Sequence, residues 1–311
     1  MRAIVTGGAG FIGSHLVDAL VARGDEVLVL DNLSSGRQAN VHTDAKLVVG
    51  DTTDPETVAT AFEETEAEVC FHLAAQVDVR VSVQDPLLDF QTNAGGTLRV
   101  LEAALGQAAQ IVFASSGGAV YGEADGPLRE DAPPRPLAPY GASKLAAEEY
   151  LAVYNRLHGS SHVSLRYGNV YGPRQDPSGE AGVVAIFLGR LAQGEDLHIY
   201  GDGRQTRDYV YVEDVVQATL GAAGKPGVFN VGTGVETSVL ELAEACRRVT
   251  GVDAETVVEP ARLGEIERSV LDPSKADREL GFRAATSLDD GLAATWEFIR
   301  ETEGEGASGA N

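Results

Sequence analysis

Tyr140 and Lys144 are the two residues whose types and spacing best suit catalysis. They lie in the stretch Tyr-Gly-Ala-Ser-Lys directly after Pro139, and residues 144–150 read as a helix. Side chains four residues apart share one face of a helix. An ammonium group beside a phenol favours the phenolate, so the spacing predicts that Lys144 lowers the pKa of Tyr140 from its usual value of about 10. Such a tyrosine can accept a proton near neutral pH. The alternative is an exposed helix start with an incidental Tyr and Lys, which the pair alone does not exclude.

A glycine-rich turn near the amino terminus predicts dinucleotide binding. The apolar run Ala3–Thr6 leads into Gly7-Gly-Ala-Gly-Phe-Ile-Gly13 and an amphipathic helix. A second strand, Glu26–Leu30, follows and is closed by Asp31. The glycines permit a tight turn, the N–H groups of the helix bind a pyrophosphate, and the acid accepts hydrogen bonds from ribose hydroxyls. A carboxylate also repels a 2′-phosphate, so Asp31 favours NAD over NADP.

The elements that must position these residues alternate regularly in the first half of the chain. Further strands are predicted over residues 46–49, 69–73, 110–114 and 163–167, and helices over 55–64 and 86–105. This alternation predicts an α/β fold with a Rossmann-type, doubly wound parallel sheet and helices on both faces. Ligands bind such sheets at the carboxyl ends of the strands. We therefore expect the glycine-rich turn, Asp31, Asp51, Ala74 and Ser115 to converge on one crevice.

The alternation loosens in the second half. Helices are predicted over residues 182–193, 212–223 and 239–250, with short strands over 197–200, 207–210 and 228–231. This pattern favours a smaller, mixed α/β lobe over the crevice. We predict an NAD-binding domain over residues 1–168, a substrate lobe over 169–303 with some chain crossing between the two, and a flexible tail over 304–311.

Composition and charge exclude several classes of function. The chain has 311 residues and a net charge of −23, which makes nucleic acid and anionic membranes poor partners. No apolar run reaches membrane-spanning length, and the chain starts directly on a strand, so we expect neither an anchor nor a signal peptide. Cys70 and Cys246 lie in apolar segments without a Cys/His cluster at ligand spacing. We therefore expect no metal site, reduced thiols and a cytoplasmic location.

Taken together, the motifs resemble those of the extended short-chain dehydrogenases/reductases, and within them the UDP-glucose (UDP-galactose) 4-epimerase family. The resemblance extends over nearly the whole chain. The matching motifs are Thr6–Gly13, Asp31-Asn-Leu-Ser34, His72-Leu-Ala-Ala75, Asn93, Tyr140-x-x-x-Lys144, Leu165–Pro173, Arg207-Asp-Tyr209 and Arg262-Leu-Gly-Glu265.

This resemblance implies a NAD-dependent 4-epimerase of UDP-hexoses that works through a 4-keto intermediate, with Tyr140 as the base. It also implies a homodimer formed by the helices over residues 86–105 and 139–158. Alternatives are another nucleotide-sugar epimerase such as a UDP-glucuronate 4-epimerase, an oxidoreductase of the same superfamily, or a non-catalytic dinucleotide sensor. Sugar dehydratases of the superfamily carry an Asp-Glu pair where this chain has Gly117-Gly-Ala119, which argues against a dehydratase.

Carried onto matching positions, the resemblance implies the site residues. The catalytic residues are Tyr140, Lys144 and Ser116. The cofactor contacts are Gly7, Gly10, Phe11, Ile12, Gly13, Asp31, Asn32, Ser34, Gly36, Asp51, Thr52, Leu73, Ala74, Ala75, Asn93, Ser115, Tyr140, Lys144, Tyr167 and Val170. The substrate contacts are Ser116, Gly117, Tyr140, Asn169, Val183, His198, Tyr200, Arg207, Arg262 and Ser269.

Two of these positions leave alternatives open. The family usually has a Ser or Thr four residues before the tyrosine of the Val-Tyr-Gly motif, and here that position is Gly117. Ser116 can substitute for it, water can bridge, or Tyr140 can act directly. The residue seven after Arg262 borders the sugar in the family and is Ser269 here. A serine leaves room for an N-acetyl group at C2, unless Arg268 or a loop fills the gap.

Overall fold

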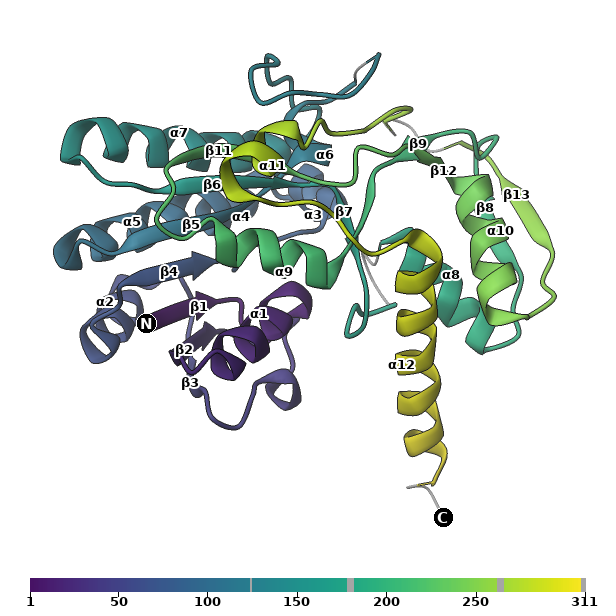
Figure 1. The fold of residues 1–311 in the computed structure, drawn as a ribbon, viewed down its shortest axis with the longest axis horizontal. Coiled ribbons are helices and arrows are strands. Elements are labelled where there is room, and N and C mark those ends of the chain that lie inside the picture. Colours follow the sequence, from purple (N-terminus) through teal and green to yellow (C-terminus); the bar gives the residue numbers. More distant parts are fainter. Residues whose placement is uncertain (124, 178–181, 262–265, 309–311) are drawn as a thin grey trace.

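The computed structural model describes residues 1–123, 125–177, 182–261 and 266–308. Its centre is a sheet of seven parallel strands in the order β11-β6-β5-β4-β1-β2-β3 (Figure 1). The chain runs outward from β1 to β3 and returns to β4 on the other side of β1, which makes a switch point between β1 and β4. The predicted doubly wound parallel sheet is therefore confirmed. Its strands are β1 (Arg2–Thr6), β2 (Glu26–Asp31), β3 (Lys46–Val49), β4 (Val69–His72), β5 (Gln110–Ser116), β6 (Val163–Tyr167) and β11 (Gly227–Val231).

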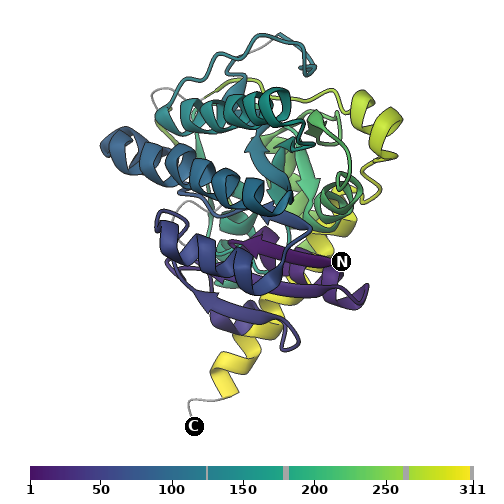
Figure 2. The ribbon, with the colours of Figure 1, turned by 90° about the vertical axis from the view of Figure 1, so that its left-hand side faces the viewer.

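Helices cover both faces of this sheet because its strands are apolar on both faces. In β1, Ala3 and Val5 belong to one core cluster, whereas Ile4 belongs to the opposite one. Successive side chains of a strand point to opposite faces, so a continuous apolar run needs cover on both. One face carries α1 (Phe11–Ala22) and α9 (Val212–Gly221); the other carries α2 (Pro55–Thr65), α5 (Gly96–Gln107) and α7 (Pro139–His158) (Figure 2).

The single helix expected over Pro86–Leu105 is wrong, because a π-helical turn interrupts it. The segment consists of α4 (Pro86–Phe90), the π-helical turn η2 (Gln91–Gly95) and α5. A π turn carries one extra residue per turn and is found mostly at functional sites. A further short helix, α3 (Val79–Gln84), precedes α4 and was not predicted. Both α4 and η2 pack against α7.

Three segments of the second half lie with the main sheet rather than in a separate lobe: α9, β11 and α11 (Ser274–Leu280), whose Ala276 is buried in the core cluster of α1. Strand β11 pairs with β6 in parallel, and α9 packs against α1. Phe229 and Val231 of β11 are buried in the same core cluster as α1. The division after residue 168 stays a prediction, with chain crossing at α9 and β11.

The rest of the second half forms a third core cluster around α8, α10 and α12. The strand expected over residues 207–210 is split at Asp208 into two short strands, and β13 was not predicted. The elements are β7 (Asn169–Tyr171), α8 (Val183–Ala192), β8 (Leu197–Tyr200), β9 (Thr206–Arg207), β10 (Tyr209–Tyr211), β12 (Thr237–Ser238), α10 (Val239–Thr250), β13 (Thr256–Glu259) and α12 (Leu288–Ser308). Three two-stranded sheets, β7 with β10, β9 with β12 and β8 with β13, lie in this part.

Helix α12 runs away from the main sheet in Figure 1. It continues through Ser308, so residues 304–308 of the predicted tail are helical, and the flexibility of that tail stays a prediction. None of the described helices is both long and apolar enough to cross a membrane.

Candidate active site

The glycine-rich turn between β1 and α1 is shaped so that only glycine fits its key positions. Gly7 has a φ of +70°, and a Cβ atom there would lie 2.7 Å from the backbone N of Ala74. A Cβ atom on Gly13 would lie 2.1 Å from the carbonyl oxygen of Gly7. Helix α1 begins directly after Gly10 with no side-chain cap on its N-terminus. Phe11, Ile12 and Gly13 therefore present backbone N–H groups of the kind that bind a diphosphate, whereas the Ser14 N–H already donates to the Gly10 carbonyl.

Asp31 joins the end of β2 to this turn. Its Oδ2 accepts a hydrogen bond from the Ala9 N–H at 2.9 Å, and its Oδ1 accepts one from the Leu33 N–H at 2.8 Å. Each carboxylate oxygen has a second acceptor position, which a ribose hydroxyl can use. Gly36 closes the same corner, since a Cβ atom there would lie 3.0 Å from Asp31 Oδ1. The residues present thus fit the ribose and diphosphate of a dinucleotide.

The predicted adenine-side residues also lie together. Asn32 Nδ2 donates to Asp51 Oδ2 at 2.7 Å, and Asn32 Oδ1 accepts from the Ser34 N–H at 3.0 Å. Burial acts to raise the pKa of Asp51, but hydrogen bonds from Thr53 and Asn32 outweigh it and hold the pKa below its usual value. Thr52 is buried beside this pair.

The loop after β4, which contains the predicted Leu73, Ala74 and Ala75, is held to β1 by contacts with a buried threonine and histidine. His72 Nδ1 lies 2.7 Å from Thr6 Oγ1, and the Ala74 N–H donates to the same oxygen at 3.1 Å. Burial, aided by the nearby Lys144 charge, lowers the pKa of His72 to about 3, so the ring is neutral. His72 is a positioning residue that its place in a sequence motif indicated but that was not predicted as part of the site.

Tyr140 and Lys144 face the carboxyl edge of the sheet from the first turns of α7. Pro139 is the first residue of this helix, which favours its start. Lys144 Nζ donates to the carbonyl oxygen of Ala114 at 2.8 Å, and it lies 6.0 Å from the centre of the Tyr140 ring. The helix therefore places the two side chains on one face, as predicted.

The predicted effect of Lys144 on the pKa of Tyr140 is wrong for the protein alone. Burial, and then the negative charge of Asp89, raise the pKa of Tyr140 to about 12, while a hydrogen bond with Ser116 acts to lower it. Burial also lowers the pKa of Lys144 to about 8, against the charges of Asp89 and Glu148. The physical reason is that burial penalises both charged forms at once.

Ser116 acts on the predicted base, Tyr140. A hydrogen-bonding contribution from the Ser116 side chain lowers the pKa of Tyr140 against burial, which favours Ser116 as the substitute for the missing family Ser or Thr. At Gly117 a Cβ atom would lie 2.7 Å from Leu271 Cδ2, so a serine at that position would collide with a buried leucine. The role of Ser116 stays a prediction, now with a contact that favours it.

A buried network anchors α7 to the sheet and was not predicted. Glu148 accepts hydrogen bonds from Arg166 Nη2 at 2.6 Å and from Ser115 Oγ at 2.5 Å. Arg166 Nη1 also donates to the Tyr121 hydroxyl at 2.8 Å, which in turn donates to Asn230 Oδ1 at 2.9 Å. The hydroxyl of Ser115, predicted to contact the cofactor, is thus directed to Glu148. The position of Glu148 one helical turn after Lys144 was the available signal.

Two predicted substrate residues, Asn169 and Ser269, meet beside Gly118. A Cβ atom on Gly118 would lie 3.7 Å from Asn169 Oδ1 and 3.9 Å from Ser269 Oγ. Ser269 is buried. The neighbouring Arg268 is directed elsewhere, with its Nε donating to Glu236 Oε2 at 2.8 Å. Ser269 therefore faces the same space as Asn169, and Arg268 does not fill it.

Asp208, between β9 and β10, fastens the segments around that space. Its buried carboxylate accepts hydrogen bonds from the Thr233 N–H at 2.8 Å, the Gly234 N–H at 3.1 Å and the Leu271 N–H at 3.3 Å. Burial raises the pKa of Asp208 despite these hydrogen bonds. The preceding Arg207 donates to the carbonyl oxygen of Thr206 at 2.9 Å.

Several other predicted residues are placed away from these contacts. The Tyr167 hydroxyl lies 2.8 Å from Thr219 Oγ1 and so points to α9. The amide of Asn93 is bonded to the main chain of the loop after β4. Val170 lies in β7, Val183 begins α8, and His198 and Tyr200 lie in β8. Arg262 lies outside the described residues. Within the described part, no group of three or more His, Cys, Asp or Glu side chains could hold a metal ion.

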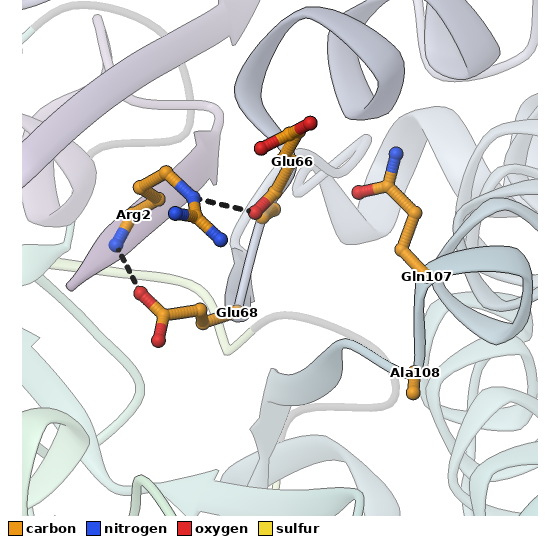
Figure 3. A pocket seen from close by; sticks show the side chains of 6 residues that line it. Arg2, Glu66, Glu68, Gln107 and Ala108 are labelled. Atoms are coloured by element: carbon orange, nitrogen blue, oxygen red, sulfur yellow. Dashed lines mark hydrogen bonds between the residues drawn. The ribbon is translucent and has the colours of Figure 1, made fainter.

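Two surface hollows lie away from Tyr140 and Lys144. One is lined by Arg2, Glu66, Glu68, Gln107 and Ala108 (Figure 3). These residues border the amino ends of β1, β4 and β5, which is the sheet edge opposite Tyr140. Another lies along α12 beside Trp296. Neither contains the predicted catalytic residues.

Known proteins are similar to this chain in sequence and in architecture. A family described as "NAD dependent epimerase/dehydratase family" matches residues 3–232. The UDP-glucose 4-epimerase of Mycolicibacterium smegmatis is 47% identical over 310 residues, covering 96% of this chain and 99% of that protein.

Solved structures of similar proteins have the same architecture. A UDP-glucose 4-epimerase from Thermotoga maritima, crystallised with UDP-glucose, has a TM-score of 0.95 and 46% identity, covering 97% of this chain and 100% of that one. One from Thermus thermophilus, in complex with NAD, has a TM-score of 0.92 and 47% identity, covering 96% and 99%. This chain, with its glycine-rich turn, Asp31 and the Tyr140–Lys144 pair at one sheet edge, belongs to the NAD dependent epimerase/dehydratase family.

Proposed function

We propose that this protein is a NAD-dependent 4-epimerase of UDP-hexoses that interconverts UDP-glucose and UDP-galactose through a 4-keto intermediate. The observation that carries the proposal is the placement of Tyr140 and Lys144 on one face of α7, where Lys144 Nζ donates to the Ala114 carbonyl near the end of β5 at 2.8 Å. The predicted substrate residues Asn169 and Ser269 meet beside Gly118, two residues after Ser116. The relatives named UDP-glucose 4-epimerase, which match nearly the whole chain, support the same reaction.

In this proposal Tyr140 is the base for the C4 hydroxyl of the sugar, and Ser116 relays the proton. Lys144 donates one of its three N–H groups to the Ala114 carbonyl, so two N–H groups can donate to a cofactor ribose. When bound, NAD supplies the redox chemistry and a positively charged ring that favours the phenolate. Arg207, Arg262 and Asn169 are the proposed partners of the sugar-nucleotide diphosphate, since guanidinium groups pair well with phosphate oxygens.

Asp31 makes NAD the proposed cofactor over NADP. A 2′-phosphate would stand beside its carboxylate, and the two like charges repel. Denaturing release from the purified protein should therefore yield NAD. Equal retention of NADP under the same conditions would contradict this assignment.

The sugar pocket is proposed to be open at Ser269. UDP-N-acetylglucosamine and UDP-N-acetylgalactosamine are then substrates in addition to the plain hexoses, because a serine leaves space beside C2. Helix α6 (Gly117–Val120) supplies no carboxylate next to the sugar, so elimination of water, as in a dehydratase, is not proposed.

The protein is further proposed to be a cytoplasmic homodimer. Apolar side chains are exposed along the adjoining α4 and α7: Leu87 is 70% exposed, Phe90 53%, Tyr150 41% and Leu157 71%. Large exposed apolar side chains on two helices that pack together favour an interface with a second copy. Phe90→Glu together with Leu157→Glu should convert a dimer to a monomer in sedimentation analysis. A wild type that sediments as a monomer would contradict the dimer.

A sugar-nucleotide panel tests the function. The purified protein, without added cofactor, is incubated with UDP-galactose, UDP-N-acetylgalactosamine and UDP-galacturonate, and the products are separated by chromatography. The proposal expects UDP-glucose from the first. Conversion of UDP-galacturonate alone would support a UDP-glucuronate 4-epimerase, and a need for stoichiometric reduced or oxidised cofactor would support an oxidoreductase.

A further inference from the structure

Asp89 is a carboxylate without a role in the proposed reaction, yet it is fully buried beside the catalytic helix. It lies in α4, immediately before the π-helical turn, and its exposed fraction is 0%. Its Oδ2 accepts a hydrogen bond from Ser143 Oγ at 2.6 Å. Its Oδ1 accepts from Asn93 Nδ2 at 2.9 Å and from Gln76 Nε2 at 3.2 Å. A charge withdrawn from water needs such compensation, and here three separate segments supply it.

The three donors come from three different segments next to Tyr140 and Lys144. Ser143 stands between Tyr140 and Lys144 on α7. Asn93 is the centre of the π turn, and Gln76 belongs to the loop after β4 that follows the predicted cofactor contacts. Asn93 also clamps the main chain of Gln76, accepting from its N–H and donating to its carbonyl, both at 2.9 Å. Asp89 is thus the point at which α7, the π turn and the cofactor loop are joined.

We propose that Asp89 is a positioning residue for the epimerisation: through Ser143 it sets where Tyr140 and Lys144 stand relative to the cofactor loop. The π turn supports this reading, because the irregular turn brings Asn93 and Asp89 to the same point, and such turns concentrate at functional sites. The inference rests on the proposed roles of Tyr140 and Lys144 and adds a residue that does not touch the sugar.

The carboxylate also acts on the charge of the site. The titratable groups on which it acts are Tyr140 and Lys144 on α7, and Lys144 in turn interacts with Glu148 and His72. Asp78, at the start of α3, is linked to it through Gln76 Nε2, which donates to the Asp78 carbonyl and to Asp89 Oδ1. His72 is neutral, and Glu148 is paired with Arg166. The Asp89 charge raises the pKa of Tyr140 and acts to raise that of Lys144. Removing it should therefore ease deprotonation of Tyr140 while misplacing the phenol.

The test is Asp89→Asn, with Asp85→Asn as the matched control. Asp85→Asn removes the same charge four residues earlier, where the exposed carboxylate caps α4 by accepting the Leu88 N–H at 3.0 Å, and Asn caps equally well. We expect Asp89→Asn to lower kcat by about tenfold to a hundredfold with KM little changed, the scale of a small misplacement of a catalytic group. The acidic limb of its pH profile should move to lower pH. The control should match the wild type.

Ser143→Ala tests the same contact without altering the charge. It should lower kcat without moving the pH profile, and the double variant with Asp89→Asn should lose less than the product of the two separate losses. Two outcomes would overturn the proposal and show that Asp89 only packs the interior. One is a loss of kcat in the double variant equal to the product of the two separate losses. The other is a loss in Asp89→Asn with an unmoved pH profile. Should Asp89→Asn not fold, which bound NAD and circular dichroism would reveal, an unaffected kcat in Ser143→Ala overturns it. A wild type without epimerase activity refutes the proposed function instead.

Discussion

At the residue scale, Gly117 shows how a missing Cβ atom places a hydroxyl group. The space that a serine side chain would need at this position is filled by Leu271. The hydroxyl that acts on the pKa of Tyr140 is that of Ser116, one residue earlier. The packing of Leu271 against Gly117 is a contact between distant residues, which counting residues back from Tyr121 could not reveal.

Tyr140→Phe should remove the base and keep the ring. We expect kcat to fall by at least ~10²-fold, the scale of general-base contributions, while UDP-sugar binding measured by calorimetry is largely retained. Tyr150→Phe is the matched control, since this exposed tyrosine lies on the same helix. Near-normal turnover of Tyr140→Phe would exclude it as the base.

Ser269→Tyr should close the sugar pocket beside C2. Its neighbours in space are Gly118 and Asn169, and Arg268 is held by Glu236, so a phenol ring would project into the same space as the sugar. Turnover of the N-acetylated pair should fall about 10- to 200-fold more than that of the plain pair. Equal effects on both pairs, or a wild type that ignores UDP-N-acetylglucosamine, would refute this gate without affecting the 4-epimerase assignment.

At the element scale, α7 is the part on which the site depends. Its first turns carry Tyr140 and Lys144, its middle is fixed to β5 and β6 through Glu148, and its partner face meets the π turn. Both Glu148 and Arg166 are nearly fully buried, so the ion pair has little water to replace a lost partner.

Arg166→Met should therefore leave the Glu148 charge unpaired in the interior. We expect the free energy of unfolding to fall by about 3–5 kcal/mol, measured by urea denaturation. Arg248→Met removes an exposed pair with Asp289 of the same length, 2.6 Å, and should change stability little. Similar losses in the two variants would contradict a special role for the buried pair.

The sequence could predict the elements whose signals are local, and it missed those that depend on distant partners. The runs Ala3–Thr6 and Glu26–Leu30, with the glycines between them, sufficed to predict two central strands and the dinucleotide turn. The π turn depends on Asp89 meeting Asn93, and the place of β11 depends on its pairing with β6. The raised pKa of Tyr140 depends on its burial and on Asp89, which no spacing of residues 140 and 144 can show.

At the scale of the whole molecule, the predicted chemistry lies at one edge of the sheet. Some other titratable side chains are buried away from that edge. His162 is one of these, 1% exposed, with its Nδ1 accepting from the Ile111 N–H at 3.0 Å. Burial lowers the pKa of His162 to about 4 from an ordinary value of 6.5. Between about pH 4 and pH 6.5, His162 is therefore protonated in the unfolded chain but neutral in the folded chain.

Stability should accordingly fall as the pH drops through this window. The contribution of neutral His162 is complete above about pH 6.5 and is lost towards pH 4, with a slope approaching about 1.4 kcal/mol per pH unit. His162→Asn should flatten the pH dependence of the free energy of unfolding relative to the wild type. Parallel curves for the variant and the wild type would contradict the assignment.

The most direct test of the central claim follows the hydrogen at C4 of the sugar. UDP-galactose deuterated at C4 is incubated with the purified protein without added cofactor, and the product is analysed by mass spectrometry and NMR. The account predicts UDP-glucose that keeps the deuterium at C4, because the hydrogen is removed and returned within one site. Loss of the deuterium to solvent or to added NAD, or no conversion by protein that contains NAD, would contradict it.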